Sequence, residues 1–422
     1  MAYLLELDVT RLARNIDSQS VKIKLGFTAE GANPPFFVLD DPVKGVLDNT
    51  DYALGGGEYY YDVSEFFVSY EISRGKSRAL DKFNAGSARV TFDNSNRYFD
   101  PLFPDSPYFG QIKPRRIIQI LVDEVVQFQG VVDDWSIDYS GNRASMATCI
   151  AYDPLSVLSE RGLFEFEPVE QLTGERITAA LNNAGWSALD RNIDAGNVIV
   201  EETFTADGAS VIDYCNTVAK SEPGEFFATK EGKIRFKDRI ALTPTSGVVF
   251  TDSPTDDMDI RYSAIAVEYG TELLYNEIVV SNSEVEYVAR DADSVEDYGA
   301  RTLDYVTYVR DEEDLVTLAD YLLPSYKDPE YRFSMLTINV LGLDEFQRQT
   351  MIDLELTDIV KVEFTPSQIP PQIMRYGRVI GIKHKVASSM FTIELQLETL
   401  ESAIFVLDDP EFGVLDTNIL GW

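Results

Sequence analysis

Ala88-Arg-Val-Thr-Phe-Asp-Asn-Ser-Asn96 alternates apolar and polar side chains as far as Asp93 and then continues with residues that favour turns. A period of two residues is typical of a strand with one buried face, and Asp, Asn and Ser often form the turn that follows. Neighbouring segments rich in aromatic and β-branched residues predict further strands. These segments span residues 59–70, 117–122, 125–132 and 147–152. Because Gly and Pro separate these short strands, we expect a barrel or a sandwich in the first part of the chain.

The pattern changes to a helical period near residue 165. A helix is predicted where apolar side chains recur every three or four residues, at Val211, Tyr214, Cys215, Val218 and Ala219. A second helix is expected between Thr173, as its N-cap, and Gly185, as its stop. Strand-like segments on both sides of Lys230-Glu-Gly232 predict a hairpin. We therefore expect a small inserted α/β module at residues 165–245.

Strand patterns return after residue 246 and end with the strict alternation of Phe391–Glu398. One helix interrupts them, and Pro324 is expected to close it. The apolar side of that helix is predicted to be Leu315, Leu318, Ala319 and Leu322. The chain as a whole is therefore predicted to be mainly β (β+α).

A twelve-residue box occurs twice in the chain. Phe37-Val-Leu-Asp-Asp-Pro-Val-Lys-Gly-Val-Leu-Asp48 returns as Phe405-Val-Leu-Asp-Asp-Pro-Glu-Phe-Gly-Val-Leu-Asp416, with ten of the twelve positions identical. Pro and Gly let the chain reverse between two apolar triplets, which are too short to form a core alone. Each box therefore needs a surface to dock on, either on its own chain as a sheet-edge piece or on a repeated partner. The residues predicted to make this contact are Phe37, Leu39, Pro42, Val46 and Leu47 in the first box and Phe405, Leu407, Pro410, Val414 and Leu415 in the second.

Acidic side chains outnumber basic ones by 71 to 36, which gives the chain a formal net charge of −35. A surface of this sign repels nucleic acid and anionic membrane, so sequence-specific nucleic-acid binding is not expected. The charge serves either solubility or a wall along which nucleic acid slides without binding. The sequence has neither a bilayer-spanning apolar segment nor the basic start of a signal peptide. We expect a protein without a membrane anchor that is made in a cytoplasm.

The usual residues of catalytic and metal sites are scarce. His384 is the only histidine, and we expect it at the surface or in an interface. Cys149 and Cys215 lie far apart in apolar patterns, so they are expected to be buried and reduced. One histidine and two distant thiols give little basis for Ser-His or Cys-His catalysis or for a zinc site. We expect no enzymatic activity, no cofactor and no metal.

A longer segment around the opening strand resembles a known family. Ile72-Ser-Arg-Gly-Lys-Ser-Arg-Ala-Leu-Asp-Lys-Phe-Asn-Ala-Gly-Ser-Ala-Arg-Val-Thr-Phe-Asp-Asn-Ser-Asn-Arg-Tyr-Phe-Asp-Pro101 is similar to a pattern in the minor tail, or tail-tip hub, proteins of long-tailed bacteriophages. Gln129–Trp135, Glu231–Arg239 and Arg378–His384 resemble further parts of these proteins, which are related in architecture to the baseplate hub of contractile tails. The resemblance covers most of residues 55–400.

The resemblance implies two hub-type β-barrel domains with the α/β module inserted between them. The implied domains are residues 1–164 (first barrel with the first box), 165–245 (module), 246–400 (second barrel) and 401–422 (tail with the second box). It also implies a homotrimer that closes a pseudo-sixfold ring at the tip of the virion tail, assembled in the host cytoplasm. The implied partners are a distal tail or tube protein, the tape measure protein and other minor tail or receptor-binding proteins. Viral DNA would pass through the ring without being bound specifically.

Two other functions stay open at the level of sequence. Trp135, Trp186, Trp422 and 22 tyrosines would suit a carbohydrate-binding receptor module if their rings were exposed. A peptidoglycan hydrolase is a weaker alternative, because 71 carboxylates place some pairs at glycosidase spacing by chance.

Overall fold

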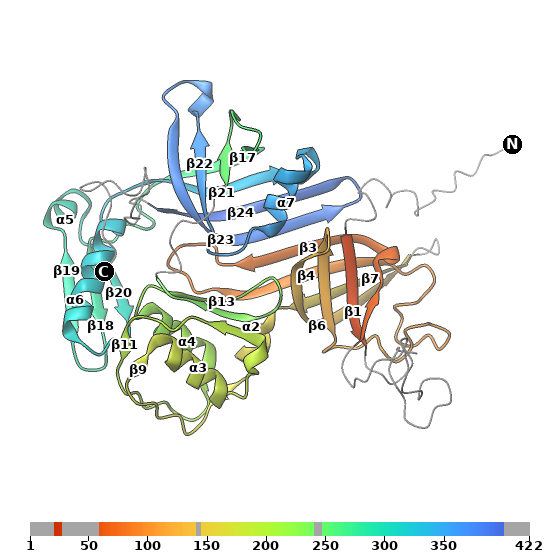
Figure 1. Ribbon diagram of the computed structural model, residues 1–422, viewed down its shortest axis with the longest axis horizontal. Coiled ribbons are helices and arrows are strands. Elements are labelled where there is room, and N and C mark those ends of the chain that lie inside the picture. Colours follow the sequence, from red (N-terminus) through yellow and green to blue (C-terminus); the bar gives the residue numbers. More distant parts are fainter. Residues whose placement is uncertain (1–20, 28–58, 141–144, 240–246, 401–422) are drawn as a thin grey trace, which may run out of the picture.

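Figure 1 shows the computed structural model of the chain. It describes residues 21–27, 59–140, 145–239 and 247–400. A long sheet crosses the molecule, and two small α/β units lie beside it. Both repeated boxes, residues 37–48 and 405–416, lie outside the described residues, and so do all ten predicted docking residues.

Fourteen strands form the main sheet. They are β1 (Val21–Phe27), β2 (Tyr59–Asp62), β3 (Phe67–Gly75), β4 (Asn84–Asp93), β5 (Ile117–Val122), β6 (Val125–Tyr139), β7 (Ser145–Tyr152), β15 (Val249–Thr251), β16 (Ile260–Arg261), β17 (Ala264–Tyr269), β21 (Tyr331–Asn339), β22 (Ile359–Phe364), β23 (Ile373–Ala387) and β24 (Met390–Leu400). The strand order is β16-β15-β22-β23-β3-β4-β7-β6-β5-β1-β2, and β24, β21 and β17 branch from β23 in that order. β15 pairs in parallel with β16 and β22, and the other described pairs of this sheet are antiparallel.

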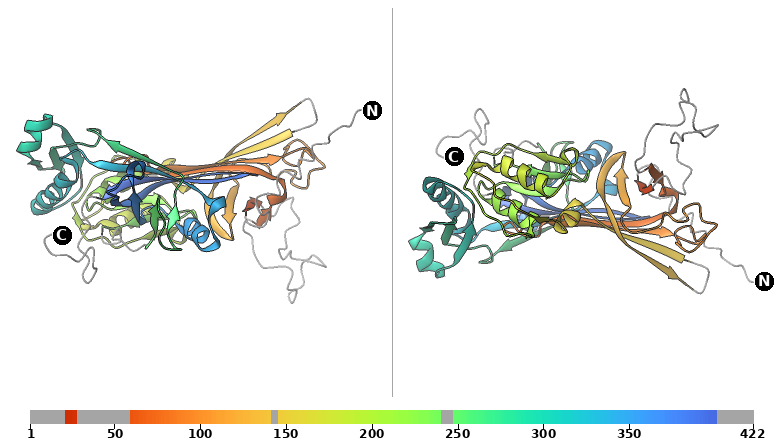
Figure 2. Two further views of the ribbon diagram at one scale, coloured as in Figure 1. Left: turned by 90° about the horizontal axis from the view of Figure 1, so that it is seen from above. Right: turned by 90° about the horizontal axis from the view of Figure 1, so that it is seen from below.

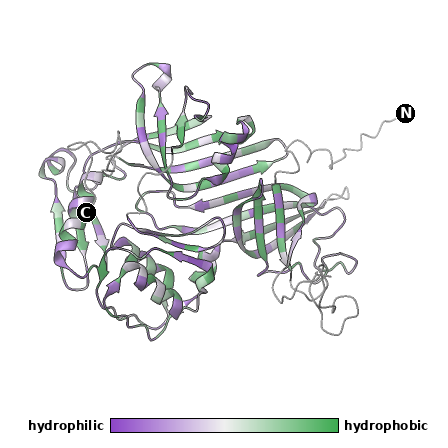
Figure 3. Cartoon of the chain, viewed as in Figure 1, coloured by the Kyte–Doolittle hydropathy of each residue, from purple (hydrophilic) through white to green (hydrophobic). Residues whose placement is uncertain are grey.

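Side chains of a strand alternate between the two faces of a sheet, and Figure 3 shows hydrophobic and hydrophilic residues following one another along the strands. The alternation predicted for residues 88–93 is confirmed in β4, because Ala88, Val90 and Phe92 are at most 1% exposed. Figure 2 shows the helix α7 (Glu345–Asp353) and the helices of the first α/β unit on one side of the sheet. The opposite face, between β24 and β6, is left uncovered by helices in the described part of the chain.

The strand β23 joins the N-terminal and C-terminal parts of the sheet. One of its edges pairs with β24, while the other pairs first with β22 and then with β3. The change of partner falls between Arg378 and Gly381. At this point the Val379 N–H donates to the Asp358 carbonyl at 2.8 Å, and the Lys76 N–H donates to the Ile380 carbonyl at 2.7 Å. The backbone of β23 is therefore held from both sides where its partner changes.

Two glycines permit this exchange of partners. Gly75 has a φ of +103°, and a Cβ added there would lie 2.2 Å from the Ile380 carbonyl oxygen and 2.6 Å from the Gly381 Cα. A Cβ on Gly381 would lie 2.8 Å from the Lys76 carbonyl oxygen. Because the neighbouring atoms are backbone atoms, neither contact is relieved by moving a side chain. Glycine is required at both positions.

The first α/β unit follows β7 in the chain. Its elements are α2 (Pro154–Ser159), β8 (Gly162–Leu163), β9 (Gln171–Leu172), α3 (Thr173–Asn183), β10 (Arg191–Ile193), β11 (Ile199–Val200), β12 (Ala209–Ser210), α4 (Val211–Lys220), β13 (Glu225–Ala228) and β14 (Ile234–Lys237). The predicted helix at residues 211–219 is confirmed as α4, and the predicted hairpin is confirmed as β13 and β14. Thr173 is the first residue of α3 and not its N-cap, which is Leu172, while Gly185 follows the helix with a φ of +67°.

A second α/β unit lies inside the span predicted as the second barrel. Its elements are β18 (Glu277–Ser281), β19 (Glu286–Arg290), α5 (Ala292–Tyr298), β20 (Thr302–Val306) and α6 (Glu312–Tyr326). Its apolar side chains form a hydrophobic core separate from that of the main sheet. The predicted apolar side of α6 is confirmed, since Leu315, Leu318, Ala319 and Leu322 are buried in this core.

The predicted end of α6 at Pro324 is wrong. The helix continues to Tyr326 with the proline in its last turn. A proline there removes one backbone hydrogen bond, but the Lys327 N–H still donates to the Leu323 carbonyl at 3.0 Å. The helix therefore tolerates the proline in its last turn.

The predicted mainly β fold with a small α/β module is confirmed. Among the described strands, the order of the main sheet does not return to its starting strand, so the closure of two barrels stays a prediction. The four domain boundaries also stay predictions.

Replacing Gly75 by alanine is expected to lower the free energy of unfolding by about 3 kcal/mol or more, because strain at positive φ adds to a steric clash with backbone. Gly110 is a matched control, since it has a φ of +76° but nothing within 4 Å of an added Cβ. Gly110→Ala should cost only about 1–2 kcal/mol. Urea unfolding of both variants measures the difference, and equal losses would contradict the clash.

Candidate functional site

Three rows of side chains cross the uncovered side of the sheet from β24 to β6. Directly opposed residues of paired strands share a face, so the strand registers define these rows. The first row is Met390, Ala387, Ser69, Thr91, Thr148 and Ser136; the second is Thr392, Lys385, Glu71, Arg89, Ile150 and Asp134; the third is Glu394, Lys383, Ser73, Ser87, Tyr152 and Val131. We call these three rows the open face.

The open face carries no net charge. Its three cations balance its three carboxylates, and Lys385 pairs with Glu394 at 2.7 Å. The hydroxyls of Thr91 and Thr148 lie 3.4 Å apart in its first row. By contrast, residues 277–328 of the second α/β unit hold fourteen acidic and four basic side chains. That unit therefore carries a net charge of −10 out of the −35 of the chain, whereas the open face carries none.

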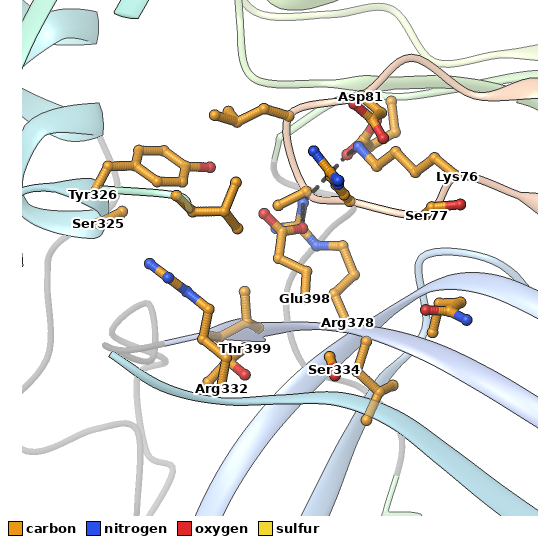
Figure 4. Close-up of a pocket in the computed structure, with 18 of the residues that line it drawn as sticks. Lys76, Ser77, Asp81, Ser325, Tyr326, Arg332, Ser334, Arg378, Glu398 and Thr399 are labelled. Carbon is orange, nitrogen blue, oxygen red and sulfur yellow. Dashed lines mark hydrogen bonds and ion pairs between the residues drawn. The ribbon is translucent and has the colours of Figure 1, made fainter. Parts of the chain in front are cut away.

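A cavity of about 730 Å³ lies where the two α/β units meet the sheet. Its wall comes from the connection between β3 and β4, from α4, β13 and α6, and from β17, β21, β23 and β24. Figure 4 shows side chains of several of these elements around it, among them Lys76, Arg332, Arg378 and Glu398. Six basic and six acidic residues line the cavity, so it is less negative than the chain as a whole. We call it the junction cavity.

One carboxylate in the cavity wall ties three parts of the chain together. Glu225 of β13 lies 2.9 Å from Lys76 Nζ and 3.5 Å from an Nη atom of Arg378 on β23. Arg378 also lies 3.4 Å from Glu398 on β24. These side chains are between 4% and 16% exposed, so solvent screens their charges weakly. The first α/β unit is thus fixed to both the N-terminal and the C-terminal strands.

Two cations in the cavity wall keep unused donor capacity. Arg332 lies 3.7 Å from Glu330, which is beyond hydrogen-bond distance, and its Nη2 atom is buried without a hydrogen-bond partner. Lys220 lies over the ring of Tyr305 at 5.4 Å, and burial lowers its pKa. Burial also raises the pKa of Glu330 to about 7. An incoming carboxylate would meet two donors that the chain itself does not saturate.

His384 is buried, with 3% of its surface exposed, so its predicted surface position is wrong. The residues next to it, Lys383 and Lys385, belong to the open face, and the alternation of β23 turns the imidazole to the core side. Burial, together with the positive charges of Arg74 and Lys230, lowers the pKa of His384 to about 3. The imidazole is therefore neutral near pH 7.

A second buried ion pair lies close to the junction. Arg74 of β3 pairs with Glu355, which follows α7. A carboxylate oxygen of Glu355 also accepts the backbone N–H of Lys230 at 2.9 Å. The ammonium of Lys230 donates to the carbonyls of Ile352 and Asp353 at 2.9 and 2.8 Å. The turn between β13 and β14 is held by this cluster against β3 and the segment before β22.

Reactive side chains are scarce in the described residues. That part of the chain contains no group of three or more His, Cys, Asp or Glu side chains that could hold a metal ion. The predicted burial of Cys149 and Cys215 as free thiols is confirmed, and burial raises the pKa of both. None of the described helices is both long enough and apolar enough to cross a membrane.

The junction cavity was not predictable as a site. The cavity wall combines residues from the connection between β3 and β4 with residues from β13, β21, β23 and β24, and each charged residue is ordinary in its own segment. The one local signal is the pair of charges around Gly75, in Arg74-Gly-Lys76, which belongs to the segment that resembles the tail proteins.

Replacing Glu225 by glutamine is expected to lower the free energy of unfolding by about 3 kcal/mol, because it leaves two buried cations without their shared carboxylate. Asp213→Asn is the matched control, since Asp213 pairs with Lys82 at 2.6 Å while both side chains are about half exposed. That variant should lose about 1 kcal/mol or less. Chemical unfolding measures the free energy of unfolding of both variants. A loss of about 1 kcal/mol or less for Glu225→Gln would show that water solvates the ion pairs around Glu225.

The low pKa of His384 predicts a dependence of stability on pH. Since its pKa is about 3 in the folded chain and about 6.5 when unfolded, the unfolded chain binds the extra proton between these values. The contribution of the neutral His384 to the free energy of unfolding is complete above pH 6.5. It is lost as the pH falls, by about 1.4 kcal/mol per pH unit. The stability advantage of the natural chain over His384→Gln should therefore shrink between about pH 6.5 and pH 4.5. Urea titrations at both pH values measure it, and a constant difference would contradict the buried neutral imidazole.

Comparison with known proteins identifies the fold. No model of a protein family matches the sequence, and no curated protein matches it. The tail protein from Neisseria meningitidis MC58 is 11% identical with a TM-score of 0.57, over 91% of this chain and 97% of that one. The 43 kDa tail protein of prophage MuSo2 from Shewanella oneidensis is 12% identical with a TM-score of 0.55, over 90% of this chain and 96% of that one. The chain has the fold of these two tail proteins, which confirms the resemblance at the level of the fold.

Proposed function

We propose that the chain is a structural protein of a bacteriophage tail, a tail-tip hub of which three copies close a ring in the virion. The observation that carries the proposal is the fold, which matches two tail proteins over 97% and 96% of their own lengths. A match of that extent includes both the long sheet and the α/β units beside it. Because one fold can serve several functions, the surfaces of this chain supply the rest of the argument.

Free strand edges support the assembly of several copies. Among the described strands, β2, β16 and β17 each pair with one neighbour. An unpaired strand edge is a template for another chain, and head-to-tail contacts between copies close a ring when their rotation fits. In the proposed homotrimer, each chain contributes both parts of its sheet, which gives the ring its pseudo-sixfold form.

In this ring the open face lines the bore. DNA-binding surfaces gather Lys and Arg against the phosphates, whereas the open face balances its three cations with three carboxylates. Viral DNA passes such a wall without being bound specifically. The distal tail or tube protein and the tape measure protein contact the ring on the tube side, and receptor-binding proteins contact it on the other. The two boxes supply docking contacts through their ten apolar and proline residues.

The packing of the tryptophans favours a structural role over carbohydrate binding. The ring of Trp135 stacks on Phe92 and Phe99 at 6.1 and 5.9 Å. The ring of Trp186 lies against the guanidinium of Arg161 at 4.9 Å. Both rings are engaged within the chain, and sugar stacking needs a free aromatic face.

The full chain at micromolar concentration is expected to form a trimer, with three times the 47.4 kDa mass of one chain. The free edges drive this assembly, and light scattering after size-exclusion chromatography measures it. Negative-stain electron microscopy should then show a ring with a central bore. A chain that stays monomeric at every concentration, or a compact trimer without a bore, would contradict the proposal.

Two cysteine variants test which surface faces the bore. Ser136→Cys lies on the open face, and Leu189→Cys lies on an exposed site of the first α/β unit, where the natural side chain is 84% exposed. In the trimer, a small maleimide should label both, while a bulky polymer maleimide should label only Leu189→Cys. Equal labelling by the bulky reagent would place the open face on the outside of the ring.

A further inference from the structure

We propose that the second box, Phe405–Asp416, docks into the junction cavity of its own chain. This proposal rests on the cavity and on the sequence of the box, and not on the proposed tail function. The sequence of the repeat allows docking either on the same chain or on a repeated partner. We assign the second box to the same chain.

The chain leaves the described structure at the rim of this cavity. Leu400, the last residue of β24, pairs with Tyr376 of β23, and both residues line the junction cavity. Asp408 follows Leu400 by eight residues. Eight residues span at most about 26–29 Å when extended, so the box reaches the cavity without any movement of β24. Such a tether also raises the effective concentration of the box at the cavity.

The cavity and the box have matching chemistry. The box places Phe405 and Leu407 directly before the paired carboxylates of Asp408 and Asp409. The apolar part of the cavity wall includes Phe83, Leu273, Leu322 and Leu397. The cavity thus offers both apolar side chains and charged groups, and its volume of about 730 Å³ lies within the usual range for binding sites.

The donors for the two carboxylates are Arg332 and Lys220. The Nη2 atom of Arg332 is buried without a partner, and Figure 4 shows its side chain at the cavity. Leaving a buried donor unpaired is unfavourable, and an incoming carboxylate removes this penalty. The balance of six bases and six acids also lets the cavity receive an acidic segment with less repulsion than the net charge of −35 would suggest.

Cross-linking in the full chain tests the docking. Cys149 and Cys215 are buried, so added cysteines are the reactive ones. The pair Leu407→Cys and Ser334→Cys places one thiol in the box and one in the cavity wall, and a short bis-maleimide should join them into a product of monomer mass. The matched control pairs Leu407→Cys with Leu189→Cys, which lies away from the cavity and should give no product.

A charge reversal separates docking from chance encounter. Arg332→Glu, added to the reactive pair, should lower the yield of the cross-link about tenfold, which corresponds to about 1.4 kcal/mol. Arg261→Glu makes the same change on an exposed residue of β16, outside the cavity wall, and should leave the yield unchanged.

Three results would overturn the proposal. The first is equal cross-linking to Ser334→Cys and to Leu189→Cys. The second is a product of dimer mass, which would show that the box of another copy occupies the cavity. The third is efficient cross-linking of Leu39→Cys, from the first box, with Ser334→Cys in place of Leu407→Cys. Because these readouts use only mass and yield, they are independent of whether the chain forms a ring.

Discussion

The pairing of β3 with β23 is the contact on which the rest of the architecture depends. It is the one described link in the main sheet between the N-terminal strands and the C-terminal strands. The two backbones approach so closely because Gly75 and Gly381 carry no Cβ at the crossing. A slip of one residue in this pairing would turn every side chain of one part to the opposite face. This single contact therefore decides that both parts share one core face and one open face.

The residues on either side of Gly75 extend the same junction to the rest of the chain. Arg74 pairs with Glu355 before β22, and Lys76 pairs with Glu225 of the first α/β unit. Three consecutive residues thus make three different contacts. Arg74 contacts the segment before β22 through its charge, Gly75 contacts β23 through the backbone, and Lys76 contacts the first α/β unit through its charge. Buried ion pairs add little net stability compared with apolar packing, but losing one partner is costly. Their effect at this junction is to penalise other arrangements of the three parts, because such arrangements would leave a buried charge without its partner.

Local patterns were predictable from the sequence, whereas the junction was not. Periods of two and of 3.6 residues are properties of neighbouring residues, so the strand at Ala88–Asp93 and the helix at Val211–Lys220 follow from the sequence. The approach of Gly75 to Gly381 depends on pairing across the whole chain, which no local period records. His384 shows an intermediate case: the alternation of Lys383 and Lys385 already placed it on the opposite face, but its polar character suggested the surface. The second α/β unit was hidden for a similar reason, because its short strands resemble those of the main sheet.

The uneven distribution of charge makes the open face and the second α/β unit electrostatically different. At physiological ionic strength, salt screens the field of an exposed charge beyond about 8 Å. This distance is less than the width of two strands. The acidic second α/β unit lies at one end of the molecule in Figure 1, away from β3 and β4, which carry Glu71 and Arg89. Its field therefore does not reach the rows at Glu71 and Arg89. A net charge of −35 thus does not make the open face repulsive, because its three rows hold three cations and three carboxylates.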